Sequence, residues 1–186
     1  MAAATRRAMP WKNGGGTTAE VAVFPPDAGM NDFVWRVSIA DVRDAGPFSD
    51  FRRVDRILSV LEGELALAVD DAPERRLTAA DAPLFFPADV PTWGGPIDGE
   101  VRDLNVMVRR HLCRAGVERL PGGTAHVGGT GETCLMIVAT GDAAVAHGAS
   151  IEMLRPFDAL LFEAPVPASV AVKSAAPSFA IRLHLN

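Results

Sequence analysis

The sequence predicts an all-β protein built from two related barrels. Three observations support this prediction: short segments of alternating polarity, closely spaced turn residues, and an internal repeat in which strands recur at matching intervals. The chain has 186 residues, of which 48% are apolar, 17 are glycine and 14 are proline. This length fits one domain or two small fused modules, and the glycine and proline content argues against a helical bundle.

The individual elements follow from the polarity pattern. Bulky apolar side chains alternate with smaller or polar ones in residues 35–40, 64–69 and 104–109. Because side chains two residues apart lie on the same face of a strand, each segment predicts a strand with two different faces. Residues 20–24 also look like a strand, and residues 51–58 are the best candidate for a short helix. Clusters of glycine, proline, asparagine and aspartate separate these segments and predict turns.

The internal repeat relates the two halves of the chain. Gly63 precedes Asp81 by 18 residues, and Gly141 precedes Asp158 by 17. In both halves the next strand follows 23 residues after the start of an Asp-Ala-x-Leu motif. The repeat predicts a duplicated β-barrel, and coincidence between two strand-rich stretches of biased composition is the alternative.

Three regions follow from the repeat. We expect a first barrel with an N-terminal arm in residues 1–112, a linker in 113–133, and a second, smaller half in 134–186 that packs on the first. A strand–glycine–strand unit followed by Asp-Ala-x-x-Phe-x-Pro resembles the cupin barrel. The resemblance implies a duplicated, cupin-like double-stranded β-helix, or bicupin. Ordinary cupins carry metal-binding histidines in the next loop, but here residues 87–93 contain none.

Composition and motifs exclude several classes of function. The net charge of −5 argues against a nucleic-acid-binding surface, and no apolar run approaches the ~20 residues of a membrane span. The N-terminus lacks the pattern of a secretory signal, and two isolated cysteines fit reduced thiols in the cytoplasm. The four histidines are scattered, so we expect no metal and no other cofactor, although the fold could still assemble a metal site. No nucleophile motif is present, so no catalytic residue is assigned.

Polar strand faces give the sharper functional prediction. Arg36 and Ser38 share one strand face, and Asn105, Met107 and Arg109 share another. If both faces point into one barrel, the two arginines make a carboxylate site, because a guanidinium group matches a carboxylate bidentately. The alternative is that these faces point toward solvent, which is the usual environment of arginine.

Five sequence blocks together resemble the HutD/Ves family. They lie at residues 9–20, 35–42, 46–49, 54–63 and 103–110, in the family's order and spacing. The resemblance implies a cupin-like double barrel of bacteria without the metal histidines, and a role in binding or regulation in histidine utilisation. It also implies formylglutamate or a related acid as the ligand. The chain departs from the family at Arg52-Arg53, where Pro-Gly is usual, and this change bears on the shape of the pocket rim.

The resemblance also supplies candidate ligand-binding residues. They are Lys12, Asn13, Thr17, Arg36, Ser38, Ser49, Arg56, Asn105 and Arg109. In this hypothesis Arg36 and Arg109 hold the carboxylate, while Ser38 and Asn105 orient the amide or formyl end. The expected partner is therefore a small carboxylate, with no nucleic acid or membrane, and a homodimer is compatible with this interpretation.

Two other functions remain open at this point. One is a metal-free cupin enzyme, an isomerase or hydrolase, with Asp55, Asp103 or a histidine as its general base. The other is a protein-interaction module that uses the outer face of the barrel. We expect binding rather than catalysis, because few candidate bases face the predicted pocket.

Overall fold

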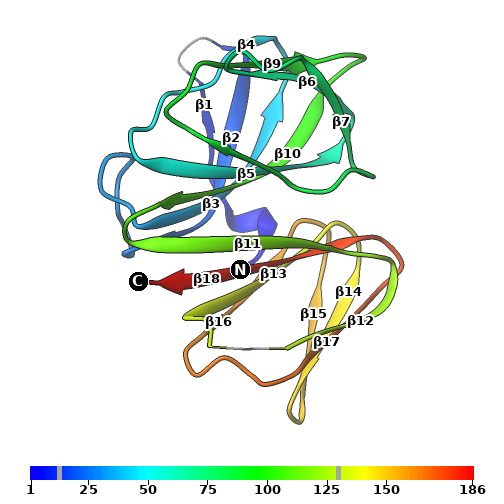
Figure 1. Ribbon diagram of the computed structural model, residues 1–186. Coiled ribbons are helices and arrows are strands. Elements are labelled where there is room, and N and C mark those ends of the chain that lie inside the picture. Colours follow the sequence, from blue (N-terminus) through cyan, green and yellow to red (C-terminus); the bar gives the residue numbers. More distant parts are fainter. Residues whose placement is uncertain (12–13, 129–130) are drawn as a thin grey trace. The chain divides into compact units, whose positions relative to one another are not determined.

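The computed structural model describes residues 1–11, 14–128 and 131–186 and consists almost entirely of β-strands (Figure 1). The strands form four antiparallel sheets. They divide into two compact units, which we call the first barrel (Arg7–Leu112) and the second barrel (Met1–Arg6 with Cys113–Asn186). Within the described residues, no helix has the length and apolar character to cross a membrane. Lys12 and Asn13, two of the predicted ligand-binding residues, lie outside the described residues.

Ten strands build the first barrel. They are β1 (Ala8–Pro10), β2 (Gly16–Phe24), β3 (Trp35–Val42), β4 (Gly46–Pro47), β5 (Val54–Glu62), β6 (Glu64–Val69), β7 (Arg75–Thr78), β8 (Leu84–Pro87), β9 (Thr92–Pro96) and β10 (Val101–Arg109). One sheet has the order β1-β2-β3-β10-β5-β8, and the other has the order β4-β9-β6-β7. The first sheet carries most of the polar strand faces described above.

Eight strands build the second barrel. They are β11 (Cys113–Leu120), β12 (Gly123–Val127), β13 (Cys134–Ala139), β14 (Ala143–His147), β15 (Ser150–Leu154), β16 (Ala159–Glu163), β17 (Val170–Ser174) and β18 (Ser178–Leu185). They form sheets of order β11-β18-β13-β16 and β12-β17-β14-β15. Both barrels therefore pair their strands antiparallel in two facing sheets.

The region expected to be a linker, 113–133, differs from that expectation. It holds β11, which pairs with β18, and β12, which pairs with β17. In β11 the outward positions carry charged residues and glycine, so the apolar alternation that marks the other strands is weak there. The N-terminal residues also belong to the second barrel, where the Ala3 amide donates to the Asp158 carboxylate at 2.6 Å.

The repeated aspartate makes the same turn in both barrels. The Thr78 amide donates to the Asp81 carboxylate at 2.7 Å, and the Arg155 amide donates to the Asp158 carboxylate at 3.0 Å. In each case the acceptor lies three residues after the donor, as expected for a side chain that stabilises a tight turn. The Asp-Ala motif found in the sequence therefore marks a structural turn before β8 and before β16.

The predicted short helix at residues 51–58 is a strand instead. β5 begins at Val54 and pairs with β10 on one side and with β8 on the other. Its central position in the sheet buries both faces, so buried apolar and polar residues occur on each face and no regular alternation is visible. This early start of β5 decides where Arg56 points.

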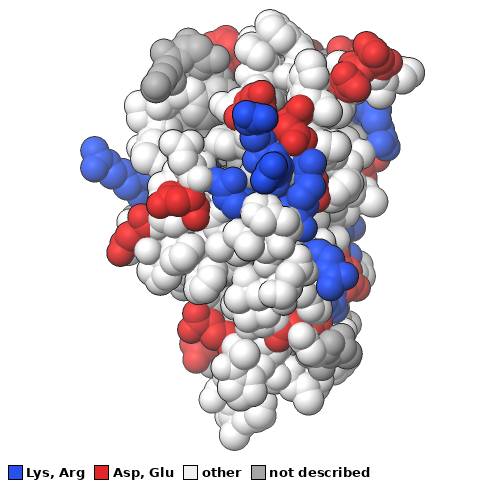
Figure 2. Space-filling model, turned by 60° about the vertical axis from the view of Figure 1, so that its left-hand side comes forward, with Lys and Arg blue, Asp and Glu red and all other residues white. Residues whose placement is uncertain are grey.

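Arginines on the outside of the first barrel pair with acids. Arg43 lies 3.0 Å from Glu100, and Arg110 lies 2.9 Å from Asp55 and 2.8 Å from Asp89. Figure 2 shows blue basic side chains gathered on one face of the molecule with red acidic side chains beside them. These exposed pairs explain part of the arginine content without a binding function, and each adds little to stability.

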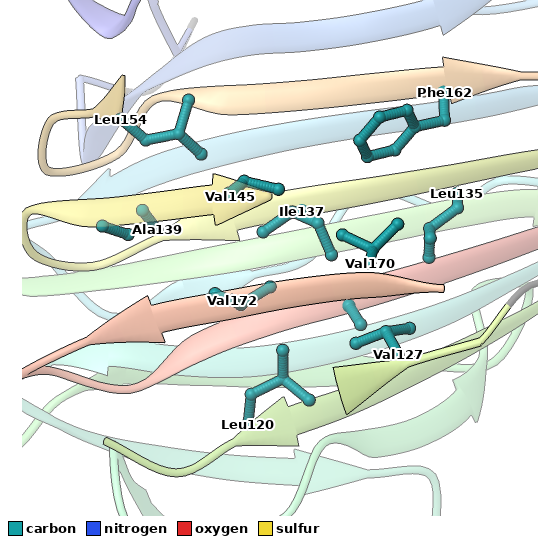
Figure 3. Close-up of a cluster of buried hydrophobic side chains, with 12 residues drawn as sticks. Leu120, Val127, Leu135, Ile137, Ala139, Val145, Leu154, Phe162, Val170 and Val172 are labelled. Atoms are coloured by element: carbon teal, nitrogen blue, oxygen red, sulfur yellow. The ribbon is translucent and has the colours of Figure 1, made fainter. Parts of the chain in front are cut away.

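The two barrels differ in what fills them. The second barrel encloses a cluster of twelve buried apolar residues, centred on side chains such as Leu135, Ile137 and Val170 (Figure 3). The first barrel buries apolar residues such as Leu65 and Leu67 at one side, but it also buries charged side chains. These buried charges define the candidate site.

Candidate functional site

A cavity of about 640 Å³ lies inside the first barrel. Residues of both sheets and of the connecting loops line it, and they include Arg36, Ser38, Arg56, Asp103 and Asn105. This volume is in the range of small-molecule binding sites, which run from about 300 to 1,000 Å³. The cavity is therefore large enough for a metabolite-sized ligand.

Strand register brings the polar residues together. In the six-stranded sheet, Asn105 of β10 lies opposite Ser38 of β3. Met107, two residues further along β10, lies between Arg36 of β3 and Arg56 of β5. Because opposite residues of paired strands share a face, all five side chains point to the cavity side of the sheet.

Arg56 is the most unusual side chain of the site. It is only 7% exposed, and its Nε atom has no hydrogen-bond partner among the described residues. Its guanidinium carbon lies 5.0 Å from the centre of the Phe48 ring and 5.9 Å from that of Phe51. Burial lowers the pKa of Arg56 to about 10, a shift that the nearby Asp103 charge opposes and Arg36 reinforces. At neutral pH, Arg56 is thus a buried cation held mainly by aromatic rings.

The aromatic cover over Arg56 depends on a glycine. Gly94 of β9 faces Phe48, and a Cβ atom at this position would lie 2.9 Å from the ring. A side chain there would crowd Phe48 and Leu67, so that one of them would have to shift. The glycine of β9 therefore positions the ring that packs on Arg56.

Arg36, in contrast to Arg56, is held by side-chain hydrogen bonds to described residues. Its Nε donates to the Glu20 carboxylate at 2.8 Å, and its Nη1 donates to the Ser38 hydroxyl at 3.3 Å. Arg36 is buried, whereas the Glu20 side chain is 36% exposed, so the ion pair reaches from the cavity wall toward the surface. The pair balances the charge of Arg36, whereas Arg56 forms no ion pair among the described residues and is influenced by the Asp103 charge only from a distance.

Asp103 and Asn105 form a buried polar pair on β10. The Asn105 Nδ2 donates to the Asp103 carboxylate, while the Asn105 Oδ1 has no partner among the described residues. Burial raises the pKa of the Asp103 carboxyl to about 7, although the Arg56 charge and the Asn105 hydrogen bond oppose this shift. The cavity therefore contains an acid that titrates near neutral pH.

Apolar and aromatic side chains form the opening of the cavity. The Trp11 Nε1 donates to the Thr18 hydroxyl at 2.7 Å, which fixes the indole ring against β2. Met9 and Met30 also line the cavity and are 46% and 43% exposed. An apolar rim around a charged interior favours an amphipathic organic ligand over a bare inorganic ion.

Five of the predicted residues line the cavity. In a sixth case the neighbouring residue lines it instead. Arg36, Ser38, Ser49, Arg56 and Asn105 line it. Thr17 does not: it lies opposite Asp41 on the outer face of the sheet, and the adjacent Thr18 faces the cavity. The family motif gives both threonines, and only the strand register distinguishes them.

Arg109 differs most from its predicted role. It does not line the cavity. Its guanidinium group donates to the backbone carbonyl of Phe33 at 2.7 Å and to that of Asn31, and it packs over the Phe33 ring. The alternation of polarity correctly predicts the strand face of Arg109. Arg109 nevertheless lies two residues further along β10 than Met107, next to the loop that precedes β3. Arg56 therefore stands where Arg109 was expected, beside Arg36.

Several residues of the site lie in the family blocks but are not among the predicted ligand-binding residues. Glu20 is the ion-pair partner of Arg36, and Phe48 covers Arg56. Asp103, which the sequence offers only as a general base, shares a strand face with Asn105. The i, i+2 spacing of Asp103 and Asn105 was the available signal, and burial of a carboxylate could not be read from it.

The departure at Arg52-Arg53 lies outside the cavity. Arg53 has a φ of +58°, a left-handed conformation in which glycine is free of strain. This agrees with a glycine at that position in the family pattern. Neither arginine lines the cavity, so the change affects a turn rather than the site.

The donor set of the cavity does not fit a divalent metal. Two guanidinium groups repel a cation, and Asp103 is the single carboxylate among the described lining residues. Within residues 1–11, 14–128 and 131–186 no three histidine, cysteine, aspartate or glutamate side chains gather in a metal-binding cluster. The described lining residues therefore lack the ligand set of a divalent-metal site.

Comparison with solved structures confirms the fold. A Cupin 2 conserved barrel domain protein from Leptotrichia buccalis superposes with a TM-score of 0.56 at 8% identity, over 96% of this chain and 92% of that chain. At such low identity the likeness concerns the fold alone. The prediction of a duplicated cupin-like barrel is confirmed.

Closer relatives identify the family. HutD from Pseudomonas fluorescens SBW25, in a structure described as a formate condition, has a TM-score of 0.86 and 26% identity, over 100% of this chain and 97% of that chain. An uncharacterized 21.2 kDa protein in the hutC 3' region of Pseudomonas putida is 34% identical over 157 residues, which are 83% of this chain and 81% of that protein. Protein Ves of Citrobacter koseri is 39% identical over 116 residues, 60% of this chain and 59% of that protein. The family model HutD matches residues 3–179, so the chain belongs to the HutD family.

Proposed function

We propose that this protein binds a small carboxylic acid without a metal ion and acts as a sensor or modulator of histidine catabolism. The observation that carries the proposal is Arg56, a buried cation in a metabolite-sized cavity, whose Nε atom has no hydrogen-bond partner in the described part of the chain. A buried charge without an ion-pair partner is destabilising unless a ligand compensates it. A carboxylate is the planar anion that a guanidinium group binds best.

The charges of the cavity favour one anionic group at this point. Arg36 is paired with Glu20 at 2.8 Å, so Arg56 is the cation that is available to a bound anion. Aromatic rings exclude water around Arg56, and an ion pair formed there is stronger than one at the surface. Arg36 and Ser38 border the same space and restrict the orientation of the bound acid.

The relatives support a place in histidine catabolism. The Pseudomonas putida relative is described by its position in the hutC 3' region, and hut denotes histidine utilisation. Acids of that pathway, above all formylglutamate, are small enough for the cavity and carry the required carboxylate. A binding protein without catalytic activity would then report the level of a pathway intermediate.

Thermal stability in the presence of candidate acids tests the proposal. N-formyl-L-glutamate, glutamate, urocanate and formate are each added to the purified protein. A specific ligand at one hundred times its dissociation constant stabilises the folded protein by about 2.7 kcal/mol. Arg56→Met should abolish this stabilisation, whereas Arg52→Met, a matched change of an exposed arginine, should keep it. If no acid stabilises the protein, or if Arg56→Met responds like the unmodified chain, the proposal is wrong.

A second candidate function is a metal-free enzyme, and Asp103 is the observation that favours it. A buried carboxyl with a pKa of about 7 suits a general base at neutral pH. Asp55, the other acid considered from sequence, instead pairs with Arg110 at 2.9 Å. If the protein turns over a pathway intermediate and Asp103→Asn abolishes this turnover, the enzyme function is supported. Binding without turnover would favour the sensor function.

A further inference from the structure

The cavity of the first barrel contains two buried polar atoms that lack partners, and they are of opposite kinds. The Arg56 Nε is a hydrogen-bond donor, and the Asn105 Oδ1 is an acceptor; neither has a partner among the described residues. Their residues are 7% and 8% exposed, so bulk water reaches them poorly. Buried polar atoms are nearly always paired in folded proteins. One ligand that enters the cavity can pair both.

A carboxylate satisfies only the first of these atoms. Its oxygens accept hydrogen bonds from Arg56 but cannot donate one to the Asn105 oxygen. We propose that the ligand carries an N–H or O–H donor in addition to its carboxylate, and that the Asn105 Oδ1 binds this donor. The inference rests on the proposed function, because it takes the carboxylate at Arg56 as given.

Asp103 determines which end of the Asn105 amide faces the ligand. The Asn105 Nδ2 donates to the Asp103 carboxylate. If the amide turned over, its oxygen would meet that carboxylate, and two acceptors would face one another. An ionised Asp103 therefore holds Asn105 with its oxygen toward the cavity. Asp103 acts here as a positioning residue.

The strand register limits the distance between the donor and the carboxylate of the ligand. Arg56 lies opposite Met107, and Asn105 is two residues before Met107 on the same face of β10. Arg56 and Asn105 are thus diagonal neighbours, whose Cβ atoms are about 7 Å apart in a regular sheet. A donor within a few bonds of the carboxylate fits this spacing. N-acylated α-amino acids have such a donor in their amide N–H, whereas simple dicarboxylates do not.

A matched pair of probes tests the inference on the unmodified protein. The first probe is N-formyl-L-glutamate, and the second is its ester analogue, in which an oxygen atom replaces the amide N–H. The two have nearly the same size and the same charge. We expect the amide to bind at least about tenfold more tightly by calorimetry at pH 8, where Asp103 is ionised, because the ester leaves the Asn105 oxygen unpaired.

Two variants link the preference to the named residues. Asn105→Leu should reduce the affinity ratio of amide to ester to about one, with binding still dependent on Arg56. Asn105→Ala gives the same comparison if the leucine variant does not fold. Asp103→Asn should also lower the ratio, because its amide group can donate to the Asn105 oxygen and release the fixed orientation. A residue with a merely structural role would change both affinities alike and leave the ratio intact.

The outcomes separate this inference from the proposed function. If both probes bind with equal affinity and both require Arg56, the carboxylate site stands and the donor site is wrong. An unchanged ratio in Asn105→Leu would likewise overturn the role of Asn105. If neither probe binds, both proposals fall.

Discussion

The two barrels of this chain share a fold but have opposite interiors. The second barrel is filled by aliphatic and aromatic side chains such as Leu135, Ile137 and Phe162 (Figure 3). The first barrel contains two arginines, an aspartate and an asparagine around a cavity of about 640 Å³. Asp103 lies 22 residues after the repeated Asp81, and the residue 22 after Asp158 is Ala180, which is also buried but apolar.

This difference separates stability from function between the two copies. Close-packed apolar interiors stabilise a fold through burial and dispersion. Buried charges around a cavity oppose stability unless they are well paired. We infer that the second barrel mainly supports the fold, while the first barrel contains the binding site. Placing a charge in the second barrel or removing one from the first tests this division.

The largest effect is expected when a carboxylate enters the second barrel. Ile137 is fully buried opposite Ala180 and Leu160, so Ile137→Asp would have no cation to pair with there. A carboxyl in such a site has its pKa raised by about 3–5 units, and the loss of stability at pH 8 is on the order of 5 kcal/mol. Urea unfolding measures the loss.

Ile137→Ala is the control for the loss of side-chain volume at this position. That variant should cost about 3 kcal/mol through the cavity it leaves, and its cost should not change with pH. The cost of Ile137→Asp should fall when the pH is lowered to 5, because the carboxyl then binds a proton. Equal, pH-independent costs for both variants would contradict the view that the apolar cluster of the second barrel excludes charge.

The next effect concerns the carboxylate that the first barrel already contains. Burial raises the pKa of Asp103 from 3.8 to about 7, so the folded protein binds its proton more tightly than the unfolded chain does. Its unfavourable contribution is absent below pH 4, and stability is lost as the pH rises from about 4 through 7. Above pH 7 the burial of the ionised Asp103 lowers the free energy of unfolding by about 4 kcal/mol. Asp103→Asn should remove this loss and be more stable than the unmodified protein at pH 9.

Unfolding by urea at pH 5, 7 and 9 measures this dependence. The matched control is Asp71→Asn, which changes an exposed acid of the same barrel and should follow the unmodified protein. If the stability difference between Asp103→Asn and the unmodified protein does not grow with pH, Asp103 is not the source of the pH dependence.

Much of the fold could be predicted from the sequence because its signals are local. Alternation predicts the strands around residues 35–40 and 104–109, and the Asp-Ala repeat corresponds to a real turn in each barrel. Local signals fail where a strand is buried on both faces, as in β5, or carries charge on one, as in β11. In both cases the environment that hides the pattern is set by neighbouring strands far away in the sequence.

The site was only partly predictable, because alternation gives the face of a strand but not the depth along the barrel. Arg36 and Asn105 lie on the cavity as their strand faces indicate. Arg109 shares the face of Asn105 but ends in the loop before β3, bound to the Phe33 carbonyl. The pairing of Arg36 with Glu20 depends on the register between β2 and β3, which includes a bulge that no sequence pattern shows.

The smallest predicted effect lies in the first barrel but outside its cavity. Arg53 has a φ of +58°, which costs a residue with a Cβ about 1–2 kcal/mol, and glycine avoids this strain. The greater freedom of glycine in the unfolded chain offsets part of the gain. Arg53→Gly should therefore stabilise the protein by roughly 0.5–1 kcal/mol in urea unfolding, whereas Arg53→Ala, which keeps the strain and removes the guanidinium group, should not. Since Arg53 does not line the cavity, both variants should bind acids as the unmodified protein does. A changed affinity in Arg53→Gly would show that this turn and the binding site are coupled, and the division between supporting and binding residues within the first barrel would then fail.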